Sequence, residues 1–275
     1  MSAATAVAPG DARVPELKVT QARVLRSEFT KFSSLRSTLW TLLCAVVLMI
    51  GISLLFALLT GSQYHAFTAS QKASFNAAAT SLTGITFAQI AFGVLGVLTM
   101  SGEYSTGMIR SSLTVVPRRL PVLWGKLAVF AGVTFGISAV ASFISFFLGQ
   151  AVLSGHHLDV GIAAPGALRS VTGAALYVTV AGLTAVGLGA LLRSTAAGIS
   201  AFVAVFFIIP PLAQALPSSI GHHLAPYLPS NAGAALYGGS GLSNPLSPWA
   251  GFALLCGYAA VVIGAAAWRL RRSDA

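Results

Sequence analysis

Residues 38–59 read TLWTLLCAVVLMIGISLLFALL, an apolar run without a charged side chain. An α-helix rises about 1.5 Å per residue, so about 20 apolar residues cross the hydrocarbon core of a bilayer. Five other segments meet the same requirement. The six predicted spans are 38–59, 81–100, 127–153, 171–192, 196–216 and 248–268. The sequence therefore predicts an all-α polytopic membrane protein, in which residues 38–272 form one domain of six transmembrane helices.

The overall composition agrees with a chain that is solvated by hydrocarbon. Of its 275 residues, 56% are hydrophobic and 8% are charged, whereas a soluble domain carries about 25% charged residues. The net charge of +10 would indicate nucleic-acid binding if the basic residues formed one stripe on a soluble face. They lie instead in short clusters between apolar runs. We therefore expect the lipid bilayer, and no nucleic acid, among the partners of this chain.

The basic clusters also predict the orientation of the spans. Of the 16 Lys and Arg residues, only Lys72 and Arg169 fall in segments that are outside if the N-terminus is inside. Loops rich in Lys and Arg stay on the cytoplasmic side of a membrane. We therefore expect a multi-pass protein of the plasma membrane with both termini in the cytoplasm.

A separate element over residues 17–37 precedes the first predicted span. Its apolar side chains share one helical face: Leu25, Phe29 and Phe32. Arg26 falls on the opposite face, and Arg36 lies at the membrane end. This pattern favours an amphipathic helix in the interfacial plane, with a basic but non-helical flank as the alternative. We expect residues 1–16 to form a disordered cytoplasmic tail.

Three outer features depart from the simple pattern of spans. The long outer segment 217–247 contains several prolines and apolar patches, which is compatible with one or two short re-entrant helices. The polar segment 61–80 has room for a short helix. Pro210 and Pro211 should kink or break the fifth span near its outer end.

The sequence contains no motif for an enzyme active site. The Gly-rich stretch YGGSGLSN at 237–244 lacks the lysine of a phosphate-binding loop. No acidic residue falls in a predicted span, which counts against a proton-coupled carrier. The histidine pairs at 156–157 and 222–223 lack a convincing third metal ligand. We expect no catalytic residue, metal or cofactor in this chain, and the sequence identifies no substrate-binding residue.

The predicted cytoplasmic loop 101–126 begins SGEYSTGMIR. We expect Glu103 at the start of a short helix, where a carboxylate favours the free backbone N–H groups and the positive end of the helix dipole. Arg110 would lie two turns further along the same face, and Pro117 would end the helix. The pattern fits a simple capped helix, and it also fits a rigid lever presented to a cytosolic partner.

Two short motifs carry a resemblance to a known family. The entry LRSEFTKF at 25–32 and the loop EYSTGMIR at 103–110 resemble the corresponding motifs of type-two ABC exporter permeases, the ABC-2 family membrane proteins, and of their actinobacterial members in particular. The six predicted spans, the basic N-terminus and the long outer segment before the last span agree with this family over essentially the whole chain.

The resemblance implies a function and a set of partners. Two permease chains would form a central path, and separate ATPase subunits, which bind ATP and magnesium, would dock from the cytoplasm. Residues 17–37 would be the connecting helix and 101–126 the coupling loop. The implied contacts with the ATPase are Glu103, Tyr104, Gly107, Ile109 and Arg110. The substrate would be a lipophilic drug, an antibiotic, a peptide or a lipid-like molecule.

Two other classes of function stay open at the level of the sequence. A secondary carrier or channel would need polar or charged groups near the middle of the membrane and would work without an ATPase. A membrane assembly or immunity factor would bind a partner without moving a substrate. A neighbouring reading frame with a phosphate-binding-loop motif would favour the exporter over both.

Overall fold

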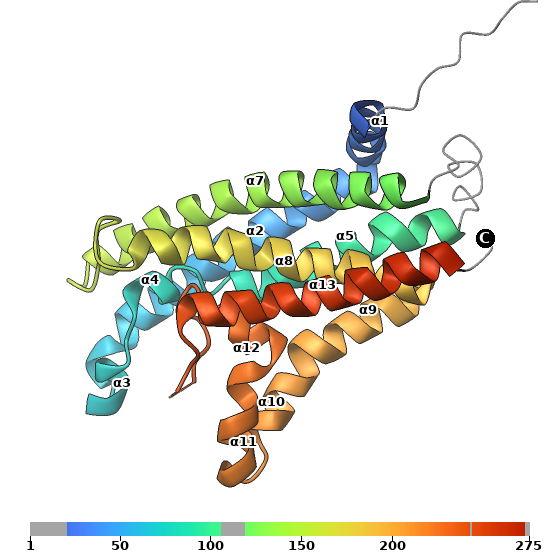
Figure 1. Cartoon of the computed structure of the whole chain (residues 1–275). Coiled ribbons are helices and arrows are strands. Elements are labelled where there is room, and N and C mark those ends of the chain that lie inside the picture. Colours follow the sequence, from blue (N-terminus) through green and yellow to red (C-terminus); the bar gives the residue numbers. More distant parts are fainter. Residues whose placement is uncertain (1–20, 106–118, 243, 273–275) are drawn as a thin grey trace, which may run out of the picture.

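The computed structural model of the chain describes residues 21–105, 119–242 and 244–272. In these ranges the chain forms helices and turns, without a β-strand. Six helices are long and apolar enough to cross a membrane, as the sequence predicts (Figure 1). They are α2 (Arg36–Gln63), α5 (Ile85–Ser105), α7 (Arg119–Ser154), α8 (Ala167–Leu192), the span Thr195–Gln214, and α13 (Pro248–Arg272). An all-α fold with six helices that could span a membrane is therefore confirmed for the described residues.

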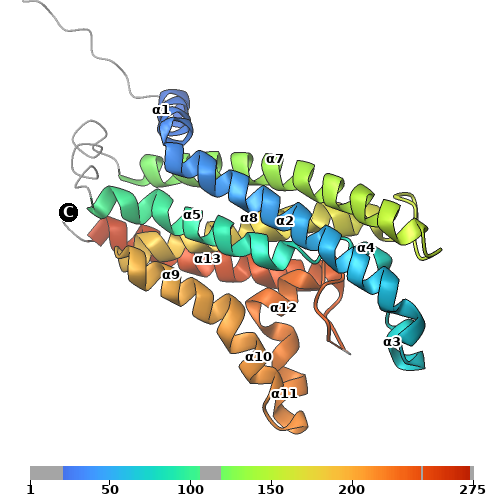
Figure 2. The ribbon, with the colours of Figure 1, turned by 180° about the vertical axis from the view of Figure 1, so that it is seen from behind.

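The shorter helices lie at the two ends of this bundle. Helix α1 (Gln21–Ser34) precedes α2, and the segment after α2 holds η1 (Tyr64–Ala66), α3 (Ala69–Ala73) and α4 (Ala77–Thr80). The segment before α13 holds α11 (Ser218–Leu224), η3 (Ala225–Tyr227) and α12 (Pro229–Ala234). Helix α1 and the C-terminal end of α13 lie at the same end, called here the α1 end, and α3 and α11 lie towards the other, the α3 end (Figures 1 and 2).

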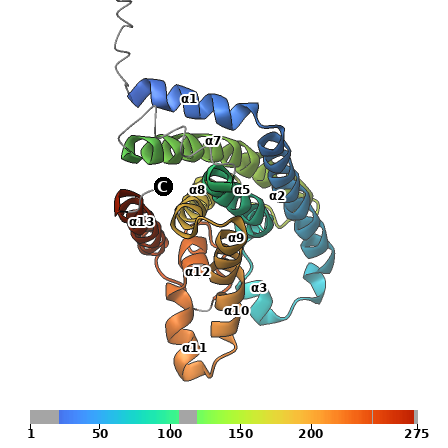
Figure 3. The same cartoon turned by 90° about the vertical axis from the view of Figure 1, so that its right-hand side faces the viewer.

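Helix α8 is the centre of the bundle. It packs against α5, α7 and α13 (Figure 3), and most of its buried positions are small residues. A Cβ atom added at Gly96 of α5 would lie 2.6 Å from the carbonyl oxygen of Gly182, and one added at Gly189 would lie 2.7 Å from that of Val97. The two backbones approach this closely only because glycine stands at the crossing, as is typical of helices packed in lipid.

The fourth and fifth spans are separate helices joined by a very short turn. Arg193 ends α8 in the left-handed conformation, with φ of 55°, and its backbone N–H donates to the carbonyl of Gly189 at 3.0 Å. The Ser194 side chain then accepts a hydrogen bond from the N–H of Ala197 and caps α9 (Thr195–Val203). The turn therefore folds α9 back beside α8.

The adjacent Pro210 and Pro211 do not break the fifth span. A π-helical turn, η2 (Ala204–Ile208), connects α9 to α10 (Ile209–Gln214), so the span stays continuous. Pro210 and Pro211 have no N–H groups and cannot bond to carbonyls one turn earlier. Widening the preceding turn to the π form accommodates the missing donors without ending the helix.

The glycine crossing predicts the effect of adding a side chain there. Gly96→Val places methyl groups against the backbone of α8, and overpacking of this kind costs about 1–3 kcal/mol or more. Thermal unfolding in detergent should therefore occur at a clearly lower temperature. The matched control is Gly132→Val on α7, where an added Cβ meets no atom within 4 Å. Equal unfolding temperatures for the two variants would contradict the close packing of α5 on α8.

Candidate functional site

The candidate site lies where α1 packs against α7. Helix α1 lies crosswise to the long helices, over the first part of α7 (Figures 1 and 3). A Cβ atom added at Gly125 would lie 3.0 Å from the Val24 side chain, so this glycine allows the close approach. The Phe32 ring meets the edge of the Phe130 ring, with centroids 6.3 Å apart. Helix α1 therefore packs on α7 through a close approach at Gly125 and an aromatic contact between Phe32 and Phe130.

The faces of α1 differ from those predicted. Val24, Glu28 and Phe32 are buried against the bundle, so Phe32 faces the protein, although the periodicity grouped it with Leu25 and Phe29. Leu25 is half-buried and Phe29 is 54% exposed. The helix therefore has a protein-facing face and a separate open apolar edge. Arg26 and Arg36 are exposed, as a basic outer face requires.

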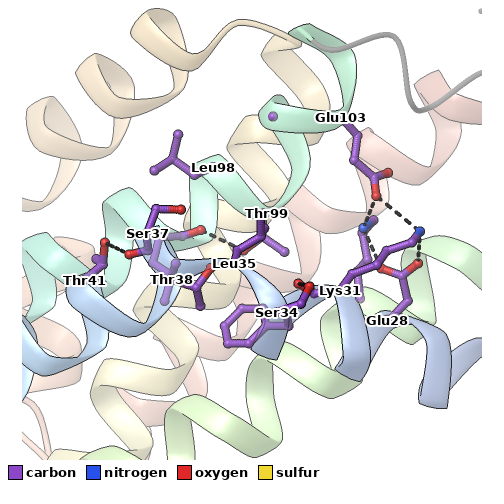
Figure 4. A pocket seen from close by; sticks show the side chains of 14 residues that line it. Glu28, Lys31, Ser34, Leu35, Ser37, Thr38, Thr41, Leu98, Thr99 and Glu103 are labelled. Carbon is purple, nitrogen blue, oxygen red and sulfur yellow. Dashed lines mark hydrogen bonds and ion pairs between the residues drawn. The ribbon is translucent and has the colours of Figure 1, made fainter.

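Four charged side chains from three helices meet under α1 (Figure 4 shows three of them labelled). The Lys126 ammonium on α7 donates to Glu28 Oε2 of α1 at 2.6 Å and to Glu103 Oε1 of α5 at 2.6 Å. Lys31 Nζ donates to Glu28 Oε1 at 2.8 Å and lies 3.6 Å from Glu103 Oε1. We call these four residues the charge cluster. It contains two acids and two bases, so the charges balance by count.

Three of the four side chains in the charge cluster are buried and depend on one another. Lys126 is 4% exposed, Glu28 5% and Glu103 8%, so none of them can rely on water. Removing one member of a buried ion pair leaves an uncompensated charge, which costs about 3–5 kcal/mol. The cluster therefore holds α1, α5 and α7 together only while all its members are present, and we call this property the lock.

The position of Glu103 corrects one expectation from the sequence. Glu103 lies in the last turn of α5, which continues to Ser105, and not at the start of a short helix. Its carboxylate accepts a hydrogen bond from the Lys126 ammonium at 2.6 Å. The expectation was wrong because the apolar run ends at Met100, whereas the helix itself does not.

The electrostatics of α1 follow from the same contacts. Burial alone raises the pKa of the Glu28 carboxyl, but Lys126 and then Lys31 outweigh it, so the pKa lies below its ordinary value. Burial alone lowers the pKa of the Lys31 ammonium, but Glu28 and Glu103 outweigh it, so the pKa lies above its ordinary value. Both groups are therefore held in their charged forms.

The other residues expected at the site lie at the end of α5 or outside the described ranges. The Arg193 guanidinium stands 5.2 Å from the centre of the Tyr104 ring, which joins α5 to the turn between α8 and α9. The Ser101 and Thr195 hydroxyls are 2.9 Å apart and add a second link between these elements. Gly107, Ile109 and Arg110 lie outside the described residues.

Sequence reasoning missed the role of Lys126 and Glu28. Lys126 counted only as one base of a cytoplasmic flank, and Glu28 only as part of a family motif. A usable signal did exist, because Glu28 and Lys31 have helical i,i+3 spacing and Gly125–Lys126 stands beside a long apolar run. Nothing in the sequence says that these charges meet.

The sequence matches no protein-family model and no curated protein. Among the described side chains, no three His, Cys, Asp or Glu residues are grouped so that they could hold a metal ion. The feature that stands out among the described residues is the charge cluster, which joins α1 to α5 and α7.

The charge cluster predicts the cost of removing its central base. Lys126→Met leaves Glu28 and Glu103 buried without their shared partner, and should lower stability by about 3–5 kcal/mol. Thermal unfolding in detergent measures the loss. The triple variant Glu28→Gln, Glu103→Gln, Lys126→Met removes the stranded charges and should recover most of it. Lys72→Met at the α3 end is the control. An unfolding temperature for Lys126→Met that matches this control would contradict the lock.

The directions in which the pKa values of Glu28 and Lys31 shift predict the pH range in which α1 stays packed on α7. Because the pKa of Glu28 is lowered, its contribution is complete above the ordinary glutamate value and is lost as pH falls through the lowered one. Because the pKa of Lys31 is raised, its contribution is complete below the ordinary lysine value and is lost as pH rises through the raised one.

The measurement is the mobility of a spin label at Ser27, with both native cysteines replaced. Mobility should stay low across neutral pH and rise only at pH values below the ordinary glutamate range or above the ordinary lysine range. Glu28→Gln should give high mobility at every pH, because the cluster is incomplete, and should therefore lose the acid transition. A transition near pH 7 in the unaltered cluster would be inconsistent with these shifts.

Proposed function

We propose that this chain is the membrane-spanning permease subunit of an ATP-driven exporter of the type-two ABC class. In this proposal it sits in the plasma membrane with both termini in the cytoplasm, pairs with a second permease copy, and takes its energy from a separate ATPase subunit. The observation that carries the proposal is the charge cluster, which joins the surface helix α1 to the two span ends that flank residues 106–118.

Glu103 and Lys126 lie on either side of residues 106–118. Glu103 is at the end of α5 and Lys126 near the start of α7, so the loop between these helices is anchored at both sides. A force applied to that loop acts on both residues, and Glu28 passes it to α1. The loop, α1 and two spans would therefore move as one body, which is what a coupling element requires. The ATPase would meet the loop at Gly107, Ile109 and Arg110.

The orientation is supported by the distribution of basic side chains. Most of the described Lys and Arg residues stand at the α1 end, and in the described part of the chain Lys72 and Arg169 are the ones at the α3 end. By the positive-inside rule, the α1 end would face the cytoplasm. The open edge of α1 at Leu25 and Phe29 would then rest on the inner leaflet. Helices α11 and α12 would form the re-entrant segment on the outer side.

The experiment is a co-purification from the cells that encode this chain. A tagged copy, solubilised in mild detergent, should retain an ATPase with a phosphate-binding-loop motif, identified by mass spectrometry. Arg110→Glu should lose most of that ATPase, because it reverses the charge at the proposed contact. Lys72→Glu at the opposite end is the matched control and should lose none. Both variants should reach the membrane in normal amounts, since neither residue lies in a predicted span.

Two results would overturn the proposal. One is the absence of any ATPase from a preparation that keeps the chain folded. The other is ATP hydrolysis by the purified chain alone, since the sequence contains no nucleotide-binding motif to support it.

A further inference from the structure

Tryptophan marks both ends of the exposed face of α13. Trp249 stands near the start of this helix and Trp268 near its end, and they are 62% and 58% exposed. They are 19 residues apart, which corresponds to about 28 Å along an α-helix. The hydrocarbon core of a bilayer is about 30 Å thick, and tryptophan gathers at its two boundaries. Trp268 would therefore lie where acyl chains meet headgroups, at the α1 end.

Arg272 is held against the ring of Trp268. Its guanidinium carbon lies 4.6 Å from the centre of that ring, one helical turn further along α13. A guanidinium that stacks on an aromatic face is attracted by the ring and keeps its N–H edge for other partners. Arg271 beside it is also exposed. A planar guanidinium can donate two parallel hydrogen bonds to a phosphate group.

The turn of α13 that carries these groups is fixed to the bundle. The Arg269 guanidinium donates a hydrogen bond to the backbone carbonyl of Leu191, at the end of α8. Leu270 is 6% exposed and packs inward. These two contacts order the end of the helix, so Arg271 and Arg272 are presented from a fixed position.

The described acidic side chains do not neutralise this end of α13. Within the described ranges the acids are Glu28, Glu103 and Asp159. The two glutamates pair with the lysines of the charge cluster, and Asp159 lies in the loop between α7 and α8, at the α3 end (Figure 1). Asp274 lies outside the described residues, and with it residues 269–275 still hold three arginines and one acid.

We propose that the last turn of α13 binds the headgroup of an acidic phospholipid. Arg271 and Arg272 donate to its phosphate. The acyl chains run along the face of α13 that ends at Trp268, where Gly264 and Val261 are exposed one and two turns earlier.

The chemistry of this surface favours an acidic lipid over two other partners. A zwitterionic headgroup carries its own cation, which the arginines repel. A soluble acidic protein would meet the arginines but would not use the exposed tryptophan and the apolar face behind it, whereas an acidic lipid meets both. The proposal needs a membrane but no ATPase, so it stands or falls separately from the exporter function.

The test is lipid binding to the delipidated full chain, measured by native mass spectrometry. Phosphatidylglycerol and phosphatidylcholine with identical acyl chains are titrated separately. Phosphatidylglycerol should bind about tenfold more tightly, because bases near the membrane surface each favour an acidic headgroup. Equal affinities would rule the site out. An excess of glycerol phosphate, which has no acyl chains, should not displace the lipid, and displacement would mean that the site takes a soluble anion instead.

A pair of double variants separates a local site from the overall charge. Arg271→Gln with Arg272→Gln should remove most of the preference for phosphatidylglycerol. Lys72→Gln with Arg169→Gln removes the same charge at the α3 end and should keep the preference. Equal losses in the two variants would mean that only net charge matters. An unchanged lipid preference in the α13 variant, together with the loss of a co-purifying protein, would assign the surface to a soluble partner.

The aromatic ring is tested without changing any charge. Trp268→Leu removes the surface on which Arg272 rests and should weaken the binding of phosphatidylglycerol about threefold. Trp249→Leu, at the other end of the same helix, is the matched control and should bind as the unaltered chain does. Both side chains are exposed, so thermal unfolding should be the same for both variants. A folded Trp268→Leu chain with unaltered affinity would contradict the proposed site.

Discussion

Close approach of backbones to α8 is the constraint on which the rest of the bundle depends. In hydrocarbon, helices gain little by burying apolar side chains against one another, because lipid chains are equally apolar. Contact must then come from small residues, and α8 supplies them to α5, α7 and α13. A Cβ atom at Gly182 would lie 2.7 Å from the Phe130 ring of α7, and that ring meets Phe32 of α1. Gly182, in the middle of the bundle, therefore leaves room for the ring of Phe130 against which α1 packs.

The charge cluster depends on that packing, and it further restricts the position of α1 on α7. Apolar contacts alone would allow α1 to slide or rotate on α7, since aromatic and aliphatic packing tolerates small shifts. Lys126 does not, because it must reach Glu28 and Glu103 at the same time. One arrangement of three helices satisfies all the charges. The charge cluster thus fixes the position of α1 at the α1 end of the bundle.

The sequence predicted the six spans well and the contacts of α1 and the charge cluster poorly, for one reason. Run length and composition report which residues avoid water, and the spans follow from that property alone. They do not report what an apolar residue touches. Phe32 and Phe29 have the same period and the same hydropathy, yet one packs on Phe130 and the other is open. Likewise, the end of an apolar run does not mark the end of a helix, so Glu103 was placed at the start of the wrong element.

The order of the charged residues along the chain has a consequence for biosynthesis. Glu28 and Glu103 are made before Lys126, and chains enter the membrane from the N-terminus as they are synthesised. Until the third span emerges, neither acid has its principal base, and burying them would be costly. Helix α1 and the end of α5 would then be joined only after α7 has been made. The arrival of Lys126 makes their burial favourable, so the surface helix is seated by a residue synthesised nearly one hundred positions after it.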